Sequence, residues 1–213
     1  MLPPRLLRSR ALSAGSLAMF CINGALTGAL FFCAQFLQIA QRQGPLGAGV
    51  RLLPWGLVPV LVGTQSGRLI ERFGERRLVL AGTVIEAAGL GWLAVAASPT
   101  VGFPAVGLGF ALAGFGIAIA VPATTKAATS SVALHDLGKA ASSFSTMRQL
   151  GGAFGVAILS AAFATDGGYG SPHAYSDGFT RAMLAGAGLA GAAFLAGLVM
   201  PLHRTGRLPG EPA

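Results

Sequence analysis

One carboxylic acid stands inside an otherwise uncharged apolar run of this 213-residue sequence, and it is the first residue that could do chemistry. Glu86 lies in the middle of the run that follows Arg77. If that run crosses a lipid bilayer, a charge at its centre costs about 2.5–3.5 kcal/mol or more, which favours a proton-binding site. The alternatives are a neutral carboxyl that hydrogen-bonds to a neighbouring helix, and a side chain that extends toward one membrane surface.

A second set of polar residues lies in the first apolar run. Its members are Asn23, Thr27, Gln35 and Gln38. On a helix with about 100° per residue they fall within an arc of roughly 120°. Lipid offers these side chains no hydrogen-bond partners, so the stripe is expected to face protein or water. It either lines a substrate cavity or bonds to a neighbouring helix, and the sequence leaves both interpretations open.

Catalytic and metal-binding side chains are present, but not in the patterns that such sites need. Four residues of the types found in hydrolytic sites lie in one glycine-rich loop. They are Asp166, Ser171, His173 and Asp177. Nothing in the sequence orients them, and a catalytic triad is defined by geometry. The histidines lie far apart, as His135, His173 and His203, and no Cys-x-x-Cys, His-x-x-x-His or Walker-type spacing occurs. We predict no catalytic residue, no metal site and no cofactor, and therefore no enzyme.

The composition indicates what kind of fold must position these residues. Hydrophobic residues make up 53% of the chain and charged residues only 10%, against roughly 25% charged in a soluble domain. So few charges cannot cover a water-facing surface. The net charge of +8 would suggest nucleic-acid binding if the basic residues formed one patch, but they occur in short clusters between long uncharged runs. We predict a polytopic membrane protein that binds no nucleic acid.

Six apolar runs are long enough for membrane-spanning helices, which need about 20 residues each. The expected spans are about 14–40, 52–70, 78–97, 102–125, 144–165 and 180–202, between a cytoplasmic segment at 1–13 and a cytoplasmic tail at 203–213. Pro54 and Pro59 predict a kink in the second span. Residues 126–142 are expected to form a loop or a short surface helix. The predicted fold class is an all-α bundle of six transmembrane helices.

The basic residues predict how this bundle is oriented. If both termini and the second and fourth loops are cytoplasmic, they hold all 15 Lys and Arg residues except Arg42, Arg51 and Arg181. The positive-inside rule therefore places both ends of the chain inside. Close helix packing is also expected, because three pairs of glycines have the G-x-x-x-G spacing that lets helix backbones approach in lipid. These pairs are Gly24 with Gly28, Gly63 with Gly67, and Gly151 with Gly155.

The loop between the second and third spans carries a recognisable motif. It reads Gly67-Arg-Leu-Ile-Glu71-Arg72-Phe-Gly74-Glu75-Arg76-Arg77. This resembles the major facilitator superfamily motif G-x-x-x-D-R-x-G-R-R/K, with matches at Gly67, Arg72, Gly74 and Arg76. Glu71 stands where the family usually has Asp, and Glu75 where it often has Arg. Gly67 would let a helix end approach its neighbour and Gly74 would permit a tight turn.

Three further segments are similar to the fourteen-helix drug:proton antiporters of that superfamily. They are Gly49–Pro54, Arg148–Gly155 and, like the linker into that family's C-terminal six helices, Pro4–Ala11. The resemblance implies that spans one, two, four and five line a cavity, which leaves Glu86 on a peripheral span. It also implies that the Glu71 loop latches one conformation of the transport cycle. Glu71 would act there by pairing with an arginine or with a helix N-terminus.

The function implied by the resemblance is proton-coupled efflux of drugs or other hydrophobic or cationic small molecules across a bacterial inner membrane. The chain would be a truncated C-terminal half of such a transporter. Its partners would be membrane lipid, the substrate, protons, and either a second copy of the chain or a missing N-terminal half. The competing interpretation is a non-transporting membrane assembly or regulatory subunit that retains the half-transporter fold.

Overall fold

The computed structural model describes residues 10–130 and 137–200, and these residues form helices without a strand. The elements are α2 (Arg10–Gln35), the short π-helix η1 (Phe36–Ala40), α3 (Pro45–Gly63), α4 (Ser66–Phe73), α5 (Glu75–Val95), α6 (Phe103–Ser130), α7 (Leu137–Asp166) and α8 (Pro172–Val199). Six of the helices are long and apolar enough to cross a membrane, which confirms the predicted fold class. The tail at 203–213, most of the 1–13 segment, His135 and His203 lie outside the described residues.

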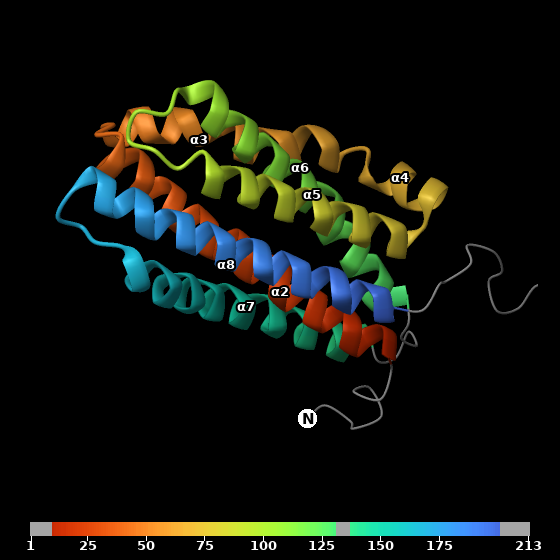
Figure 1. Ribbon diagram of the computed structural model, residues 1–213. Coiled ribbons are helices and arrows are strands. Elements are labelled where there is room, and N and C mark those ends of the chain that lie inside the picture. The colour runs from red at the N-terminus through yellow and green to blue at the C-terminus, as the bar shows by residue number, and fades with distance from the viewer. Residues whose placement is uncertain (1–9, 131–136, 201–213) are drawn as a thin grey trace, which may run out of the picture.

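The six long helices run side by side along a common direction (Figure 1). Helix α3 packs on α6, α6 on α2, and α2 on α7, which gives a row of four helices. Helices α5 and α8 pack on each other and cover one side of this row, α5 against α6 and α8 against α2 and α7. Helices α3 and α7 are therefore the two edges of the row, and α3 is the least buried of the six spans.

Both ends of the described chain lie at the same end of the bundle. The first turn of α2, the last turn of α8 and the short helix α4 gather there (Figure 1). Met200 Cε lies 3.8 Å from the position that a Cβ of Gly15 would occupy. This arrangement agrees with an even number of spans. Which side of the membrane it faces stays a prediction of the positive-inside rule.

Helices α3 and α8 begin about seven to eight residues earlier than the sequence predicts, and local capping explains both differences. Helix α3 starts at Pro45 instead of about residue 52, because Gly44 is extended and proline is preset for a first helical turn. It ends at Gly63, so the rest of the expected 52–70 span turns into α4. Helix α8 starts at Pro172 instead of about residue 180, because Ser171 Oγ accepts a hydrogen bond from the Ala174 N–H at 3.1 Å.

The segment at 126–142, expected to be a loop or a short surface helix, is largely helical and continuous with the spans. Helix α6 extends to Ser130 and α7 begins at Leu137, while residues 131–136 lie outside the described part of the chain.

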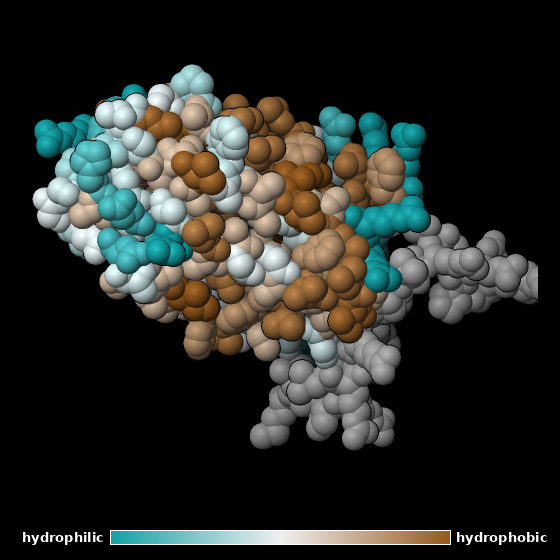
Figure 2. All heavy atoms as spheres, in the orientation of Figure 1, coloured by the Kyte–Doolittle hydropathy of each residue, from teal (hydrophilic) through white to brown (hydrophobic). Residues whose placement is uncertain are grey.

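Hydrophobic side chains cover the middle of the face seen in Figure 2, and hydrophilic ones gather at both ends of the bundle. This banding is what a lipid-spanning surface requires.

Glycines bring the backbones of α2 and α7 into contact. A Cβ on Gly155 would overlap the Gly24 carbonyl, and one on Gly28 would lie 2.9 Å from the Gly155 carbonyl oxygen. Two of the predicted G-x-x-x-G pairs are thus confirmed as one interface. The third is wrong within the described residues, because Gly63 and Gly67 belong to different helices and no described atom lies within 4 Å of either Cβ position.

A second glycine contact, between α5 and α6, was not predicted. A Cβ on Gly82 would lie 2.6 Å from the Gly116 carbonyl oxygen, and one on Gly89 would lie 2.5 Å from the Ala113 nitrogen. The glycines of α5 are spaced seven residues apart instead of four, so a search for G-x-x-x-G misses them. The α2–α7 contact joins two helices of the row, and the α5–α6 contact joins the row to the pair formed by α5 and α8.

Candidate functional site

Two members of the predicted polar stripe lie at the contact between α2 and α7. Asn23 Nδ2 donates to the backbone oxygen of Arg148 at 2.8 Å and lies 3.5 Å from Thr27 Oγ1. Gly152 leaves room for both, since its Cβ would lie 3.1 Å from Asn23 Nδ2 and 3.2 Å from Thr27 Oγ1. For Asn23 the structure therefore shows the helix-to-helix hydrogen bond that was one of the two expected roles.

The other two members of the stripe lie elsewhere. Gln35 is about 18 Å along the helix axis from Asn23, at the last residue before the π-helix η1. Gln38 is exposed, and its Nε2 donates to the carbonyl oxygen of Ala34 in its own chain segment at 3.2 Å. The predicted stripe of four is thus two separate pairs, and a lining role for either pair stays a prediction.

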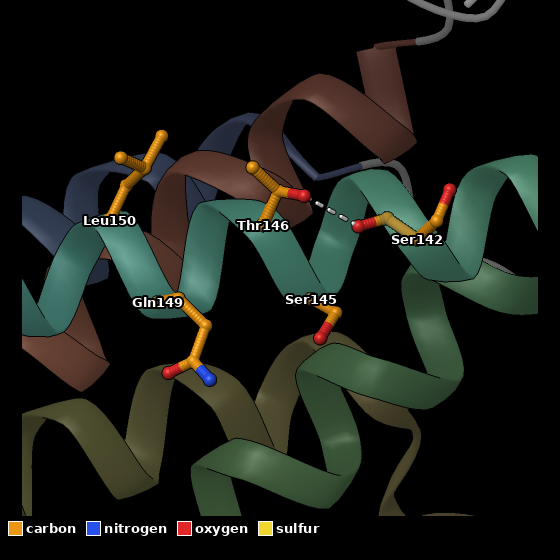
Figure 3. A pocket seen from close by; sticks show the side chains of 5 residues that line it. All are labelled: Ser142, Ser145, Thr146, Gln149 and Leu150. Atoms are coloured by element: carbon orange, nitrogen blue, oxygen red, sulfur yellow. Dashed lines mark hydrogen bonds between the residues drawn. The ribbon is translucent and has the colours of Figure 1, made fainter.

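A polar face on α7 borders a hollow at the surface of the helix. The hollow has a volume of about 490 Å³ and is lined by Ser142, Ser145, Thr146, Gln149 and Leu150. Ser145 and Gln149 project from one side of the helix, while Thr146 and Leu150 project from the opposite side (Figure 3). Thr146 Oγ1 donates to the Ser142 carbonyl oxygen at 3.0 Å. No described residue hydrogen-bonds to the side chain of Ser145 or Gln149, so both are available to water or a ligand.

A second hollow, of about 450 Å³, lies between α2 and the same part of α7. Its lining is mostly apolar and comprises Leu12, Ser13, Ser16, Leu17, Phe20, Ser143, Thr146 and Met147. Thr146 lines both hollows, so the first half of α7 presents apolar surface together with several hydroxyl and amide groups. Such a surface suits an amphipathic molecule, which needs both apolar contact and a few polar groups.

The polar face of α7 was missed at the sequence level, although its signal is present. Ser142, Ser145, Gln149 and Gly152 recur every three or four residues, which is the period of one helix face. Ser142 was assigned to the expected loop at 126–142, and Ser145 was counted only as part of the expected span at 144–165. Gln149 and Gly152 were considered only within the segment Arg148–Gly155, for its family resemblance. Once α7 is known to begin at Leu137, the four positions fall on one continuous helix.

The loop motif forms a short helix at the end of the bundle where α2 begins and α8 ends. Ile70 of α4 is buried in a cluster with Val79 and Met200. Gly74 has a φ of +82°, and its N–H donates to the Ile70 carbonyl oxygen at 2.9 Å. This confirms Gly74 as the residue that permits the tight turn. Gly67 makes no close helix approach to any described residue, contrary to what the motif implied.

The charged residues of the motif do not act as one cluster. Arg76 Nη2 donates to the carbonyl oxygen of Leu198 at 2.7 Å, where it meets the negative end of α8. The Arg72 guanidinium lies over the Phe73 ring, 5.4 Å from its centroid. Glu71 is exposed and forms no ion pair with another described residue. Arg76 therefore fixes α5 to α8, while the carboxylate of Glu71 remains available at the surface.

Glu86 lies outside both hollows. Its side chain is 0% exposed, and neither carboxyl oxygen has a hydrogen-bond partner among the described residues. Neither expected alternative, a hydrogen bond to a neighbouring helix or extension to a membrane surface, is found there.

Two of the four residues considered as a hydrolytic set have other roles in the structure. Asp166 Oδ2 accepts from Arg181 Nε at 2.5 Å, and Ser171 caps α8. Within residues 10–130 and 137–200, no group of His, Cys, Asp and Glu could hold a metal ion. The arrangement offers surfaces for binding and a buried acid, and the described loop between α7 and α8 forms no catalytic constellation.

No protein-family model matches the chain. It is similar to a multidrug resistance protein B homolog of Mycobacterium tuberculosis, with 29% identity over 157 residues, which is 73% of this chain and 29% of the relative. It is 31% identical over 159 residues to the tetracenomycin C resistance and export protein of Streptomyces glaucescens, covering 75% of this chain and 29% of the relative. A puromycin resistance protein of Streptomyces alboniger is 32% identical over 192 residues, or 84% of this chain and 37% of the relative. The chain thus spans about a third of the length of these relatives.

Proposed function

We propose that this multi-pass membrane protein, a homologue of the multidrug and antibiotic resistance and export proteins of the major facilitator type, works as one six-helix half of a drug exporter. The proposal includes proton-coupled efflux of hydrophobic or cationic small molecules across a bacterial inner membrane. It assigns the chain a transport role and no enzymatic one. In transporters of this type, the substrate binds near the bilayer midplane between two such halves.

The observation that carries the proposal is the polar face of α7. Ser145 and Gln149 are exposed, have no described partner, and border the hollow of about 490 Å³. Lipid cannot satisfy hydroxyl and amide groups, so this face needs water or another protein against it. Because α7 is one edge of the four-helix row, a second half placed against the row would enclose the hollow and turn it into a wall of a central cavity.

The partner in this proposal is a second six-helix half, either another copy of the chain or an N-terminal half that resembles those of the relatives. Glu71 supports a contact between halves at the end of the bundle where α2 begins and α8 ends, since its carboxylate is exposed and unpaired among the described residues. The N-terminus of a helix in the second half, or an arginine there, would attract it. The latch implied by the loop motif would then close between the halves.

Transport in inside-out membrane vesicles tests the proposal. We would compare the chain alone with the chain fused behind the N-terminal part of the Streptomyces glaucescens relative, using ethidium as the substrate. A proton gradient, acid inside, should drive ethidium uptake that a protonophore abolishes. The variants Ser145→Leu and Gln149→Leu should lower the rate about tenfold, which corresponds to about 1.4 kcal/mol. Leu195→Ala, on an exposed surface of α8, is the matched control and should have no effect.

Each outcome has a defined meaning. Uptake by the chain alone would identify a second copy as the partner, and uptake only by the fusion would identify the N-terminal half. No uptake from either preparation, with both proteins correctly inserted, would contradict export and favour a non-transporting membrane subunit. Uptake that persists with the protonophore would contradict proton coupling.

A further inference from the structure

The contact between α5 and α6 places two backbones against each other on both sides of Glu86. Gly82 lies one turn before Glu86 and Gly89 one turn after it, on the same face of α5. Gly116 of α6 lies over the Glu86 backbone, where a Cβ would be 2.5 Å from the Glu86 nitrogen. No space remains there for a side chain on α6. The carboxyl group is therefore enclosed by a helix contact that opens only if the two backbones separate.

The surroundings of Glu86 along α5 are apolar. Leu90, one turn further on, is fully buried in a cluster with Ala113 and Ala190. Val79, two turns before, is fully buried in a cluster with Ile119. Gly186 of α8 lies beside Leu90, and Gly197 beside Val79 and Leu80. Helix α8 thus passes the level of Glu86 between these two contacts and closes the other side.

The charged and titratable groups on the elements packed against α5 do not face Glu86. Those on α4 are exposed, Lys126 of α6 is exposed near the end of that helix, and those of α8 lie in its outer turns, on the far side of the Leu90 contact. They are Arg68, Glu71, Arg72, Lys126, His173, Tyr175, Asp177 and Arg181. On α5 itself the others are Glu75, Arg76 and Arg77, in the first turn. Among the buried side chains of the described residues, Glu86 is the only Asp, Glu, Lys or Arg.

We propose that Glu86 is a proton-binding site inside this six-helix unit, and that release of its proton opens the contact between α5 and α6. With the proton bound, the neutral carboxyl fits the closed contact. When the O–H bond breaks, the proton passes to water and the carboxylate remains. An isolated charge in an apolar interior is very costly, so the carboxylate requires water or a cation between the helices. Separation of the backbones at Gly82 and Gly116 supplies that access.

Stability alone does not account for an acid at this position. A buried polar group without a partner costs about 1–3 kcal/mol, and an apolar side chain of similar size would avoid that cost. Proton binding gives the acid a use that leucine or methionine cannot replace. The link to export rests on the proposed function, because a proton released in one conformation and bound in the other couples the gradient to movement of α5. The proton site itself does not depend on export.

The experiment measures protonation and opening in the full chain in lipid nanodiscs. Infrared spectroscopy detects the C=O band of a protonated carboxyl, and hydrogen exchange by mass spectrometry reports the backbone at 82–90 and 109–120. The pH would be raised from about 5 to about 9, the range that covers documented buried carboxyls. The variants are Glu86→Gln and the matched control Glu75→Gln, which makes the same change in the first turn of the same helix.

In the wild type and in Glu75→Gln, the band should disappear as the pH rises. Exchange at the two segments, corrected for the intrinsic effect of pH, should increase about tenfold or more, since the charged state strongly favours the open contact. In Glu86→Gln the band should be absent and exchange should stay constant. If the glutamine variant does not fold, Glu86→Met carries the same prediction.

A band that persists over the whole range, with constant exchange, would overturn the proposal and leave Glu86 as a permanently neutral structural group. Exchange that rises equally in Glu86→Gln would also overturn it. Neither readout uses a drug or a gradient. Titration of Glu86 without ethidium transport would therefore contradict the proposed function alone, and transport without titration of Glu86 would contradict this inference alone.

Discussion

The α2–α7 contact and the α5–α6 contact are built in the same way, yet they differ in whether nearby polar side chains are accessible and have hydrogen-bond partners. In both, glycines let two helix backbones touch. At α2–α7, Asn23 finds a partner in the Arg148 carbonyl oxygen, and the neighbouring face of α7 presents Ser145 and Gln149 to an open hollow. At α5–α6, Glu86 is enclosed and finds no described partner.

The difference follows from where each contact lies in the bundle. Helix α7 is an edge of the four-helix row, so one side of its contact with α2 remains open. Helix α5 lies between α6 and α8, so α8 covers the other side of α5 from its contact with α6. Glycines thus allow both pairs of helices to touch, whereas position in the bundle decides whether nearby polar groups are accessible. An accessible polar face suits substrate binding, and an enclosed acid suits proton binding.

The largest effects are expected from filling the two glycine contacts. Gly155→Ala and Gly116→Ala should each lower the free energy of unfolding by about 1–3 kcal/mol, because the added methyl group forces the backbones apart. Chemical denaturation in detergent micelles, followed by circular dichroism, measures this. Gly191→Ala is the control, since no described atom lies within 4 Å of its Cβ position. If Gly116→Ala is as stable as this control, the two contacts are not built alike.

Replacing the buried acid should have a smaller effect, in the opposite direction. Glu86→Met removes two unpaired oxygens and leaves no other group without a partner. The free energy of unfolding should therefore stay unchanged or rise by about 1 kcal/mol. The same denaturation assay tests this. A loss of more than about 1 kcal/mol would mean that the carboxyl stabilises the contact, and the contrast between the two regions would then fail.

The smallest effect is expected at the α2–α7 hydrogen bond. Asn23→Ala should cost about 0.6 kcal/mol, the average for hydrogen bonds between transmembrane helices. Gln38→Ala is the matched control, because Gln38 bonds only to its own chain segment and should cost nothing measurable. Equal losses in the two variants would show that the bond to Arg148 does not join the helices.

The fold could be predicted from the sequence because hydrocarbon imposes a simple constraint. Uncharged runs of about 20 residues must be helical in lipid, and this predicts six spans. Helix ends were harder to predict. The starts of α3 at Pro45 and of α8 at Pro172 depend on capping residues that lie beyond the apolar runs. A hydropathy pattern locates apolar runs. It gives no signal at the residue where a capped helix begins, because the apolarity of the sequence does not change there.

The candidate site could be predicted only in part. Gly74 is tied to its turn by backbone geometry, so its role could be inferred from one residue type. The grouping of Asn23 with Gln35 did not hold, because a shared helix face says nothing about distance along the axis. The helical period of Ser145 and Gln149 is present in the sequence, but their exposure beside a hollow depends on tertiary packing. The same holds for Glu86, whose enclosure depends on glycines in α6 that are far away in the sequence.

The most direct test of the account is the accessibility of the α7 polar face to water in the membrane. Single cysteines at Ser145 and Gln149 would be labelled with a membrane-impermeant maleimide and compared with Ile158→Cys on the same helix. The native Cys21 and Cys33 are buried, so the wild type gives the background. Because the reactive thiolate needs water, the account predicts labelling at 145 and 149 that is at least about tenfold faster than at 158. Equal rates at the three positions would contradict it, since the polar face would then be no more accessible to water than the apolar surface.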